Sequence, residues 1–343
     1  MINDKPVLNI EDSEALLGYL RHHGHIGSSE QPAIKILAGG VSNRTVLVTR
    51  SSGEAWVVKQ ALAKLRVQVD WFSRPERMYR EASGLRWLAQ LAPRGTITPL
   101  IFEDHDHHLL AMQAVPQPHE NWKVLLLAGQ LETQHIEQFA RLLGKIHSNA
   151  YRDRDRLASV FEDYSFFESL RLEPYYEYSA TQVPEAADFL RGLVQQTRAR
   201  RLTLVHGDFS PKNILVHRGK LILIDHEVIH WGDPAFDVGF SLTHLLSKAN
   251  HLPPYRSAFK AAAHCYWQVY HQILGRLNWV EDLETYAIRH TLGCLLARIV
   301  GRSPLEYLSA SERNRQRKVV LAFLIVSKPK TIPQLIDEFI NRL

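Results

Sequence analysis

Four polar side chains suited to phosphoryl transfer are concentrated in the segment 206–237. They are Asp208, Asn213, Asp225 and Glu227. An apolar run on each side of the turn 218–219 predicts a β-hairpin, which brings Asn213 at one end close to Asp225 at the other. Carboxylate and amide oxygens are the ligands that Mg²⁺ prefers, and a carboxylate can accept a proton from an attacking hydroxyl. The segment therefore predicts magnesium-assisted phosphoryl transfer.

Each of the four side chains receives a separate predicted role. Asp208 orients the acceptor hydroxyl and accepts its proton, as a carboxylate of ordinary basicity can do when the transition state is loose. Asn213 and Asp225 hold Mg²⁺, and Glu227 is either a further or water-mediated metal ligand or a solvent-facing carboxylate at the rim. The alternative for the whole set is structural, with Asp208 capping a turn and Asp225 closing a hairpin.

A second pair of charged residues lies upstream of this segment. Lys59 ends an apolar strand that begins at Ala55, which is the position from which a kinase lysine holds the α- and β-phosphates. Glu81, on a predicted helix over 75–91, can pair with Lys59 and direct its flexible side chain. Glu76 is the competing partner, and two exposed surface charges are the alternative.

A glycine-containing turn separates the first two predicted strands, 33–37 and 45–49. It contains Gly39, Gly40, Ser42 and Asn43. Glycine lets the backbone approach a phosphate closely and point N–H groups at it. A plain hairpin turn has the same composition, so the position of this turn ahead of Lys59 carries the functional interpretation.

The order HGDxxxxN, then IDxE, then GDPAFD resembles the aminoglycoside phosphotransferase and choline kinase superfamily. The resemblance implies an α+β, bilobal protein-kinase-like fold. Residues 1–115 would form a small lobe with an antiparallel sheet, and residues 116–343 a larger, mainly helical lobe. It also implies a hinge from Met112 to Val115 that meets the adenine, ATP or GTP with Mg²⁺ as cofactors, and a small hydroxylated metabolite as acceptor. Only a short linker follows Asp225, which leaves no platform for a peptide acceptor.

A partial resemblance to the 5-methylthioribose kinases extends over more of the chain. It rests on the run 57–62 around the lysine and on Gly293, Cys294 and Arg298 in a late helix. The sequence departs from that family at Ala297, where a second arginine is expected, at the retained Asn213, and in the order Asp225-His226-Glu227. A sugar kinase of this type is therefore an alternative. The candidates for the acceptor pocket are Trp231, Asp233 and Arg298.

The composition limits the other function classes. The chain has 343 residues, 45% hydrophobic and 22% charged, with a net charge of +5 and two cysteines. These values predict a globular cytoplasmic protein without disulfides. The charges form no basic block and no apolar run could span a bilayer, so neither a nucleic acid nor a membrane is an expected partner. A monomer or a homodimer is expected. A nucleotide-binding module without catalysis is the rival from another class.

Further helices are predicted, and two segments keep open interpretations. The predicted helices are 10–22, 136–147, 184–200, 236–249, 255–274, 280–300, 311–326 and 332–343. The turn 103–107 carries acidic residues and histidines, but five consecutive turn residues cannot easily converge on one ion, so a solvated hairpin tip is expected. The aromatic segment 151–178 is either an insertion on the substrate side or part of the core.

Overall fold

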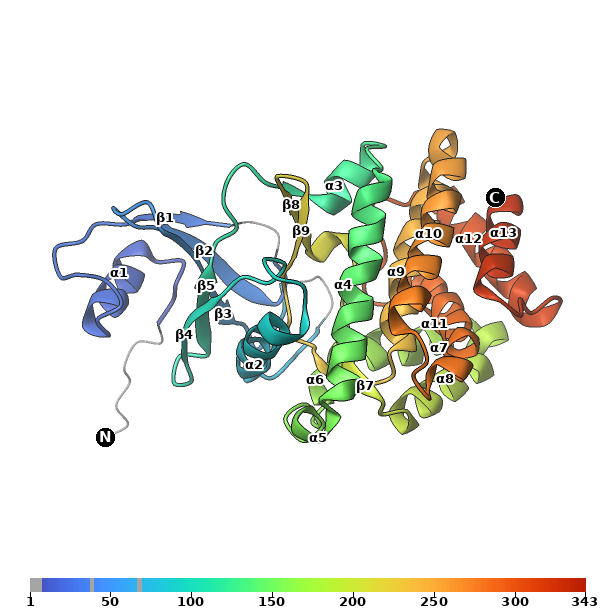
Figure 1. Ribbon diagram of the computed structural model, residues 1–343, viewed down its shortest axis with the longest axis horizontal. Helices are drawn as coiled ribbons and strands as arrows, with labels where there is room; N and C mark the ends of the chain where they lie inside the picture. Colours follow the sequence, from blue (N-terminus) through green and yellow to red (C-terminus); the bar gives the residue numbers. More distant parts are fainter. Residues whose placement is uncertain (1–7, 38–39, 67–69) are drawn as a thin grey trace.

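The computed structural model describes residues 8–37, 40–66 and 70–343, and its elements form a β-rich N-terminal part and a helical C-terminal part (Figure 1). The main sheet is antiparallel with the strand order β1-β2-β3-β5-β4. Its strands are β1 (Ala33–Ile36), β2 (Asn43–Thr49), β3 (Ala55–Ala61), β4 (Leu100–Asp104) and β5 (Leu109–Gln113). The expected α+β bilobal architecture is confirmed.

One helix covers each face of this sheet (Figure 1). Helix α1 (Ser13–His22) packs on the face that carries Trp56 and Val58, and helix α2 (Arg77–Leu91) packs on the face that carries Ala61. Successive side chains of a strand point to opposite faces. Lys59, between Val58 and Gln60, therefore points to the side of α2.

A smaller sheet in the C-terminal part contains the predicted hairpin. Strands β8 (Ile214–His217) and β9 (Lys220–Leu223) pair antiparallel, and β6 (Glu120–Asn121) pairs with β8. The turn residues Arg218 and Gly219 have φ of 49° and 71°, the left-handed conformations that a tight two-residue hairpin turn requires. The N–H of Ile224 donates to Asn213 O at 3.0 Å, so the two ends of the hairpin meet as predicted.

The remaining elements are mostly helices. They are α3 (Trp122–Leu127), α4 (Thr133–Arg152), α5 (Arg154–Leu157), α6 (Ser165–Phe167), a π-helical segment (Glu168–Glu177), α7 (Tyr178–Gln182), α8 (Ala187–Ala199), α9 (Ala235–His251), α10 (Arg256–Leu274), α11 (Val280–Val300), α12 (Ala310–Ile325) and α13 (Ile332–Asn341), with short strands β7 (Thr203–Val205) and β10 (His230–Gly232) pairing with each other. Helix α9 is buried along its whole length except at His251, and it packs against α10 and α11. No helix in the described part of the chain has both the length and the apolarity to cross a membrane.

The π-helical segment was not predicted from the sequence, and α3 was expected only as part of a helical pattern beginning at Trp122, without bounds of its own. Helix α3 is only a turn and a half long, which is too short for a clear apolar period. The π-helical segment contains Pro174. Proline inside a helical pattern indicates a helix end, and the wider winding of a π-helix blurs the 3.6-residue period.

The close approach of α9 and α11 depends on Gly239. A Cβ at this position would lie 2.6 Å from both His290 Cβ and the backbone N of Thr291. We expect Gly239→Ala to destabilise the protein by about 1–3 kcal/mol, because neither helix backbone can move aside without disturbing the core. Urea unfolding measures this. Gly18→Ala in α1, where nothing lies within 4 Å, is the control and should be neutral or slightly stabilising. Equal unfolding midpoints for the two variants would contradict the predicted close packing.

Buried histidines predict that stability falls in mild acid. His230 is buried, its Nδ1 lies 3.0 Å from Val228 O, and burial lowers its pKa to about 4. In the unfolded chain the histidine pKa is about 6.5. Between these values only the unfolded state binds the proton, so this residue lowers stability by about 2 kcal/mol as pH drops from 8 to 5. Urea unfolding at both pH values should show a smaller drop for His230→Gln, whereas the exposed His22→Gln should keep the full drop.

Candidate active site

Lys59 lies between two carboxylates that come from distant parts of the chain. Its Nζ donates to Glu81 Oε1 at 2.7 Å and to Asp225 Oδ1 at 2.8 Å. Burial alone would lower the pKa of Lys59, but the charges of Asp225 and Glu81 outweigh it and raise the pKa, so the amine stays protonated. Glu76, the competing partner, is exposed at the N-terminus of α2. Lys59 thus joins the sheet, α2 and the segment that follows β9.

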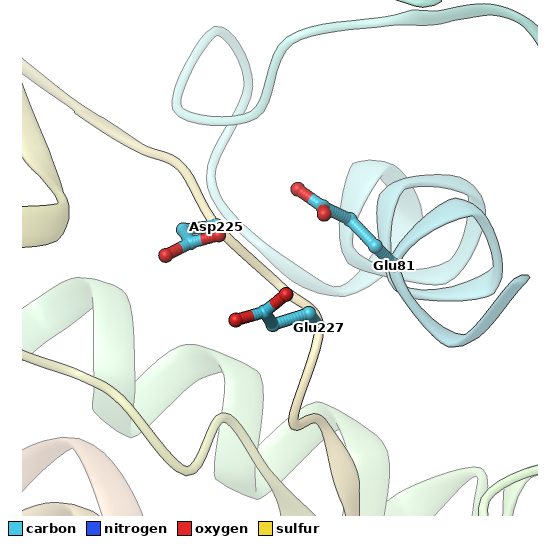
Figure 2. A group of neighbouring side chains, drawn as sticks. All are labelled: Glu81, Asp225 and Glu227. Atoms are coloured by element: carbon cyan, nitrogen blue, oxygen red, sulfur yellow. The ribbon is translucent and has the colours of Figure 1, made fainter. Parts of the chain in front are cut away.

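Three carboxylates lie close to one another beside this lysine, and Figure 2 shows how their side chains are placed. Glu81 comes from α2, whereas Asp225 and Glu227 follow β9, and carboxylate oxygens of all three lie within 4.8 Å of one another. Burial raises the pKa of Glu81, whereas Lys59 and Lys212 overcome the burial of Asp225 and hold its pKa low. Asp225 has φ of 69°, which is rare outside glycine and turns its backbone sharply at this point. Such backbone conformations persist where the surrounding contacts hold them, often at functional sites.

A fully buried arginine, Arg77, holds Glu227. Its Nε donates to Glu227 Oε2 at 3.1 Å, and Asn43 Nδ2 donates to the same oxygen at 3.1 Å. The other guanidinium N–H groups donate to the backbone carbonyls of Ser42, Leu62, Ser73 and Arg74. Arg77 therefore fixes the glycine-containing turn, the start of α2 and the Glu227 segment relative to one another.

Asp208 lies beside Asn213, at the same open end of the hairpin as Asp225. Asn213 Nδ2 donates to Asp208 Oδ2 at 2.7 Å, and Arg171 Nη2 lies 3.0 Å from the same oxygen. Asp237 holds the Asp208 loop in place, because it accepts the N–H of His206 at 2.7 Å and of Gly207 at 2.8 Å. The loop is therefore rigid, with the carboxylate of Asp208 oriented by an amide and a guanidinium.

His206 takes part in holding this loop. Asp208 N–H donates to His206 Nδ1 at 3.2 Å, so the proton of the neutral ring is on Nε2, which faces His226 Nδ1 at 3.1 Å. Burial lowers the pKa of both rings. A neutral, hydrogen-bonded histidine pair positions the loop and the segment after β9 relative to each other.

The polar atoms left over fit a divalent metal ion. Among the described residues, no hydrogen bond reaches Asn213 Oδ1, Asp225 Oδ2 or Glu227 Oε1, whereas the second polar atom of each side chain is already bonded. These are hard oxygen donors carrying two negative charges, which is the ligand set that Mg²⁺ takes while keeping water and phosphate in its other positions. The residues present therefore fit the ion that the sequence predicted.

The predicted phosphate-binding turn and hinge lie at the edge of this network. Gly39 lies outside the described residues, and a Cβ on Gly40 would lie 3.4 Å from Asn43 O, so this turn is tight. Met112 lies on β5, paired with Val57, and Val115 is buried directly after the strand. His119 Nδ1 lies 3.1 Å from Val115 O, so this carbonyl already has a polar neighbour.

The three candidates for the acceptor pocket are placed differently. Trp231 packs in the core on β10, and Asp233 accepts Arg200 Nε at 3.0 Å and the N–H of Ala235 at the start of α9. Neither contacts Asp208 or Asp225 in the described structure, so the fold does not bring them into this network. Arg298, on α11, is buried, and its Nη1 donates to Tyr175 OH at 3.2 Å.

Sequence reasoning missed two residues of this site, Arg77 and Arg171. Arg77 lies on the same helix as Glu81, and its helical spacing from Glu81 places both on one face, which is a signal that could have found it. Arg171 belongs to the π-helical segment and contacts Asp208 and Gly207 O, the latter at 2.8 Å. No local sequence pattern predicts this contact. The aromatic segment 151–178 thus contributes to the site as well as to the core.

The turn 103–107 holds no metal-ligand cluster in the described part of the chain. Among the described residues, the one group of acidic, histidine or cysteine side chains close enough to share an ion consists of Glu81, Asp225 and Glu227. Asp104 instead binds His107 Nδ1 at 2.9 Å and Tyr19 OH at 2.6 Å. This part of the turn is an ordinary hydrogen-bonded hairpin tip.

The buried Arg77–Glu227 pair predicts a large, specific loss of stability. Arg77→Met leaves Glu227 buried without its cation, which should cost about 3–5 kcal/mol. Arg86→Met on the same helix removes an exposed pair with Glu103 and should cost less than about 1 kcal/mol. Urea unfolding of both variants compares them. A similar small cost for the two would show that Arg77 does not hold the Glu227 segment.

Comparison with known proteins places this chain in a family. The model of the Phosphotransferase enzyme family (APH) matches residues 33–275. Methylthioribose kinase of Pectobacterium atrosepticum is 25% identical over 298 residues, which are 78% of this chain and 70% of that protein. Methylthioribose kinase of Yersinia enterocolitica is 29% identical over 233 residues, 60% of this chain and 58% of that protein. The chain thus spans between about half and three quarters of the length of these relatives.

The fold likeness extends over nearly the whole chain. The crystal structure of a choline kinase from Cryptosporidium parvum has a TM-score of 0.57 and 12% identity, and the likeness covers 95% of this chain and all of that one. The expected superfamily, the expected likeness to methylthioribose kinases and the expected enzyme class, a small-molecule kinase, are confirmed. The chain belongs to the Phosphotransferase enzyme family, on the bilobal fold of the small-molecule kinases.

Proposed function

We propose that this protein uses Mg²⁺ and ATP or GTP to transfer the γ-phosphoryl group to a hydroxyl of a small metabolite. One observation carries the proposal: Lys59 Nζ donates to both Glu81 and Asp225, while Asp208 and Asn213 contact each other where the first strand of the same hairpin begins. A phosphate-binding lysine, metal-ligating oxygens and a proton acceptor then lie around one short hairpin. Phosphoryl transfer needs this combination of positioning and charge.

Separate residues would bind the phosphates, the metal ion and the adenine. Lys59 binds the α- and β-phosphates and is directed by Glu81, and the turn at Gly40, Ser42 and Asn43 covers the phosphates with backbone N–H groups. Asn213 and Asp225, with Glu227 as the further candidate ligand, would hold Mg²⁺, which would supply positive charge to offset the charge of the phosphates. Residues of the segment Met112 to Val115 receive the adenine.

Asp208 acts at the acceptor. Its Oδ2 is held by Asn213 and Arg171, which leaves Oδ1 to accept a hydrogen bond from the attacking hydroxyl and then its proton. Arg171 also places a positive charge beside the reacting hydroxyl, where negative charge grows as the proton leaves. The boundary between the lobes near residue 115 belongs to this proposal, because the nucleotide would bind between the sheet and the catalytic loop.

A sugar acceptor such as methylthioribose is a second candidate. It is favoured by the 25% and 29% identity to two methylthioribose kinases, although the matches do not cover the full length of those proteins. Ala297 stands against it, because the resemblance to that family leads us to expect a second arginine there. ADP release with methylthioribose, compared with choline and a panel of polyols, separates this candidate from other hydroxyl acceptors.

Asp208→Asn tests the proposal directly. We expect kcat to fall by about 10²–10⁴-fold, because the amide cannot accept the proton, while Mg–nucleotide affinity stays within a few-fold of the original value. Coupled measurement of ADP release and nucleotide titration of the same samples check both. Asp188→Asn, at an exposed position of α8, is the control and should keep full turnover. Full turnover in Asp208→Asn removes Asp208 from this role. Nucleotide binding without turnover on any acceptor favours a non-catalytic binding module.

A further inference from the structure

A group of basic side chains on α3, α9 and α11 lies outside the set of catalytic residues described above. Lys248 and His244 come from α9, Arg298 from α11 and Lys123 from α3. They are close enough to interact: burial lowers the pKa of His244, and the charges of Lys248, Arg298, Lys123 and Lys212 lower it further. Among the described residues, the carboxylate that acts on Lys248 is Glu306, whose side chain is 64% exposed and is hydrogen-bonded by Lys123. Positive charge therefore exceeds negative charge in this group.

Lys248 is the least expected member. It is completely buried, its Nζ donates to His244 O at 3.3 Å, and its ammonium lies 5.4 Å from the Tyr307 ring. In the described part of the chain it forms no ion pair. Burial lowers its pKa to about 7. A buried ammonium without a paired anion is unfavourable, so a lysine at this position favours a bound counter-ion.

Other polar atoms in the same group also lack partners. His244 Nε2, Arg298 Nε and Tyr307 OH are buried and have no hydrogen bond within the described structure. Buried polar atoms are nearly always paired, and exceptions point to a missing water or ion. An anion with two or three oxygens would satisfy several of these atoms together, with charge-assisted hydrogen bonds.

The group is connected to the proposed catalytic residue through aromatic and guanidinium contacts. Arg171, which contacts Asp208, lies with its guanidinium 5.5 Å from the Tyr175 ring. Arg298 lies at the same distance from that ring, and its Nη1 donates to the Tyr175 hydroxyl at 3.2 Å. The basic group is thus connected to Asp208 through Tyr175 and Arg171.

Helix α9 sets the distance between the catalytic loop at Asp208 and the basic group at Lys248. Ser241 Oγ donates to Phe209 O at 3.0 Å, which fixes this point of the helix directly beneath the catalytic loop. Lys248 lies seven residues further along, a rise of about 10 Å. A molecule that reaches both ends therefore needs several bonds between its reacting hydroxyl and its anionic group.

We propose that the acceptor carries an acid group, a carboxylate or a phosphate, which Lys248, His244 and Arg298 bind while its hydroxyl lies at Asp208. The inference rests on the proposed function, because it takes Asp208 as the reacting end. It narrows the acceptor class: neutral polyols and cationic amino alcohols lack the group that this site binds.

A binding experiment tests the anion site without any need for turnover. Thermal unfolding is followed in saturating Mg–ADP, so that the nucleotide's phosphates occupy the Lys59 side. The probes are two matched pairs, D-gluconate with D-glucitol and D-ribose 5-phosphate with D-ribose. We expect at least one acid to raise Tm more than its neutral partner, and the pair that responds identifies a carboxylate or a phosphate.

Lys248→Met assigns that response to the site. Methionine keeps most of the buried side-chain volume without the charge, so the variant should fold, with unchanged or higher stability. We expect it to need roughly tenfold or more acid for the same shift, as for loss of a hydrogen bond to a charged group. Lys145→Met, at an exposed position of α4, should respond like the original protein. Equal responses of acids and neutral partners, or of the two variants, overturn the proposal.

Turnover separates this inference from the proposed function. ADP release is measured with the same two pairs, and the acid should exceed its neutral partner in kcat/KM, with the loss in Lys248→Met appearing in KM. If acids and neutral compounds react equally well, the kinase function stands and the anion site is rejected. If none releases ADP while acid binding still depends on Lys248, the anion site stands and transfer to these acceptors is rejected.

Discussion

The ammonium of Lys59 is the contact on which the arrangement of the site depends. It is bound by Glu81 from the helix over the sheet and by Asp225 from the segment after β9, at 2.7 and 2.8 Å. Without it, Glu81, Asp225 and Glu227 would bring three negative charges within 4.8 Å of one another in a largely buried place. Unscreened like charges at that separation repel strongly, so the two parts of the chain would separate or the carboxylates would take up protons.

Arg77 forms a buried ion pair with Glu227, as Lys59 does with Asp225. Both cations come from the N-terminal part and both carboxylates from the C-terminal part, so each ion pair joins the two parts of the fold. Lys59 and Arg77 neutralise two of the three carboxylates, and among the described residues no hydrogen bond reaches Asp225 Oδ2 or Glu227 Oε1. We propose that a divalent cation bound with a polyphosphate takes these oxygens, so that the same residues serve as structural links and as metal ligands.

Helix α9 contributes residues both to the support of the catalytic loop and to the proposed acceptor site. At its first turn Asp237 accepts two backbone N–H groups and holds the Asp208 loop. Further along, His244 and Lys248 carry the basic group that we assign to the acceptor. Because this helix is buried on all sides, neither contribution can shift without disturbing α10 and α11. Relatives that share the fold differ in the acceptor they are named for, so the acceptor has to be argued from these side chains and not from the fold.

The sequence by itself determined the hairpin and the order of most elements, and it singled out Lys59, Glu81, Asp208, Asn213 and Asp225 as the candidate site residues. These depend on local patterns: apolar alternation, a two-residue turn and short fixed spacings, which act over a few residues and are readable one segment at a time. Tertiary structure alone decided that Arg77 binds Glu227 and that Arg171 reaches Asp208. It also placed Trp231 and Asp233 away from the network and left Lys248 buried without an ion pair among the described residues. Those outcomes depend on which side chains meet after segments from separate secondary-structure elements have packed, and no local period encodes that meeting.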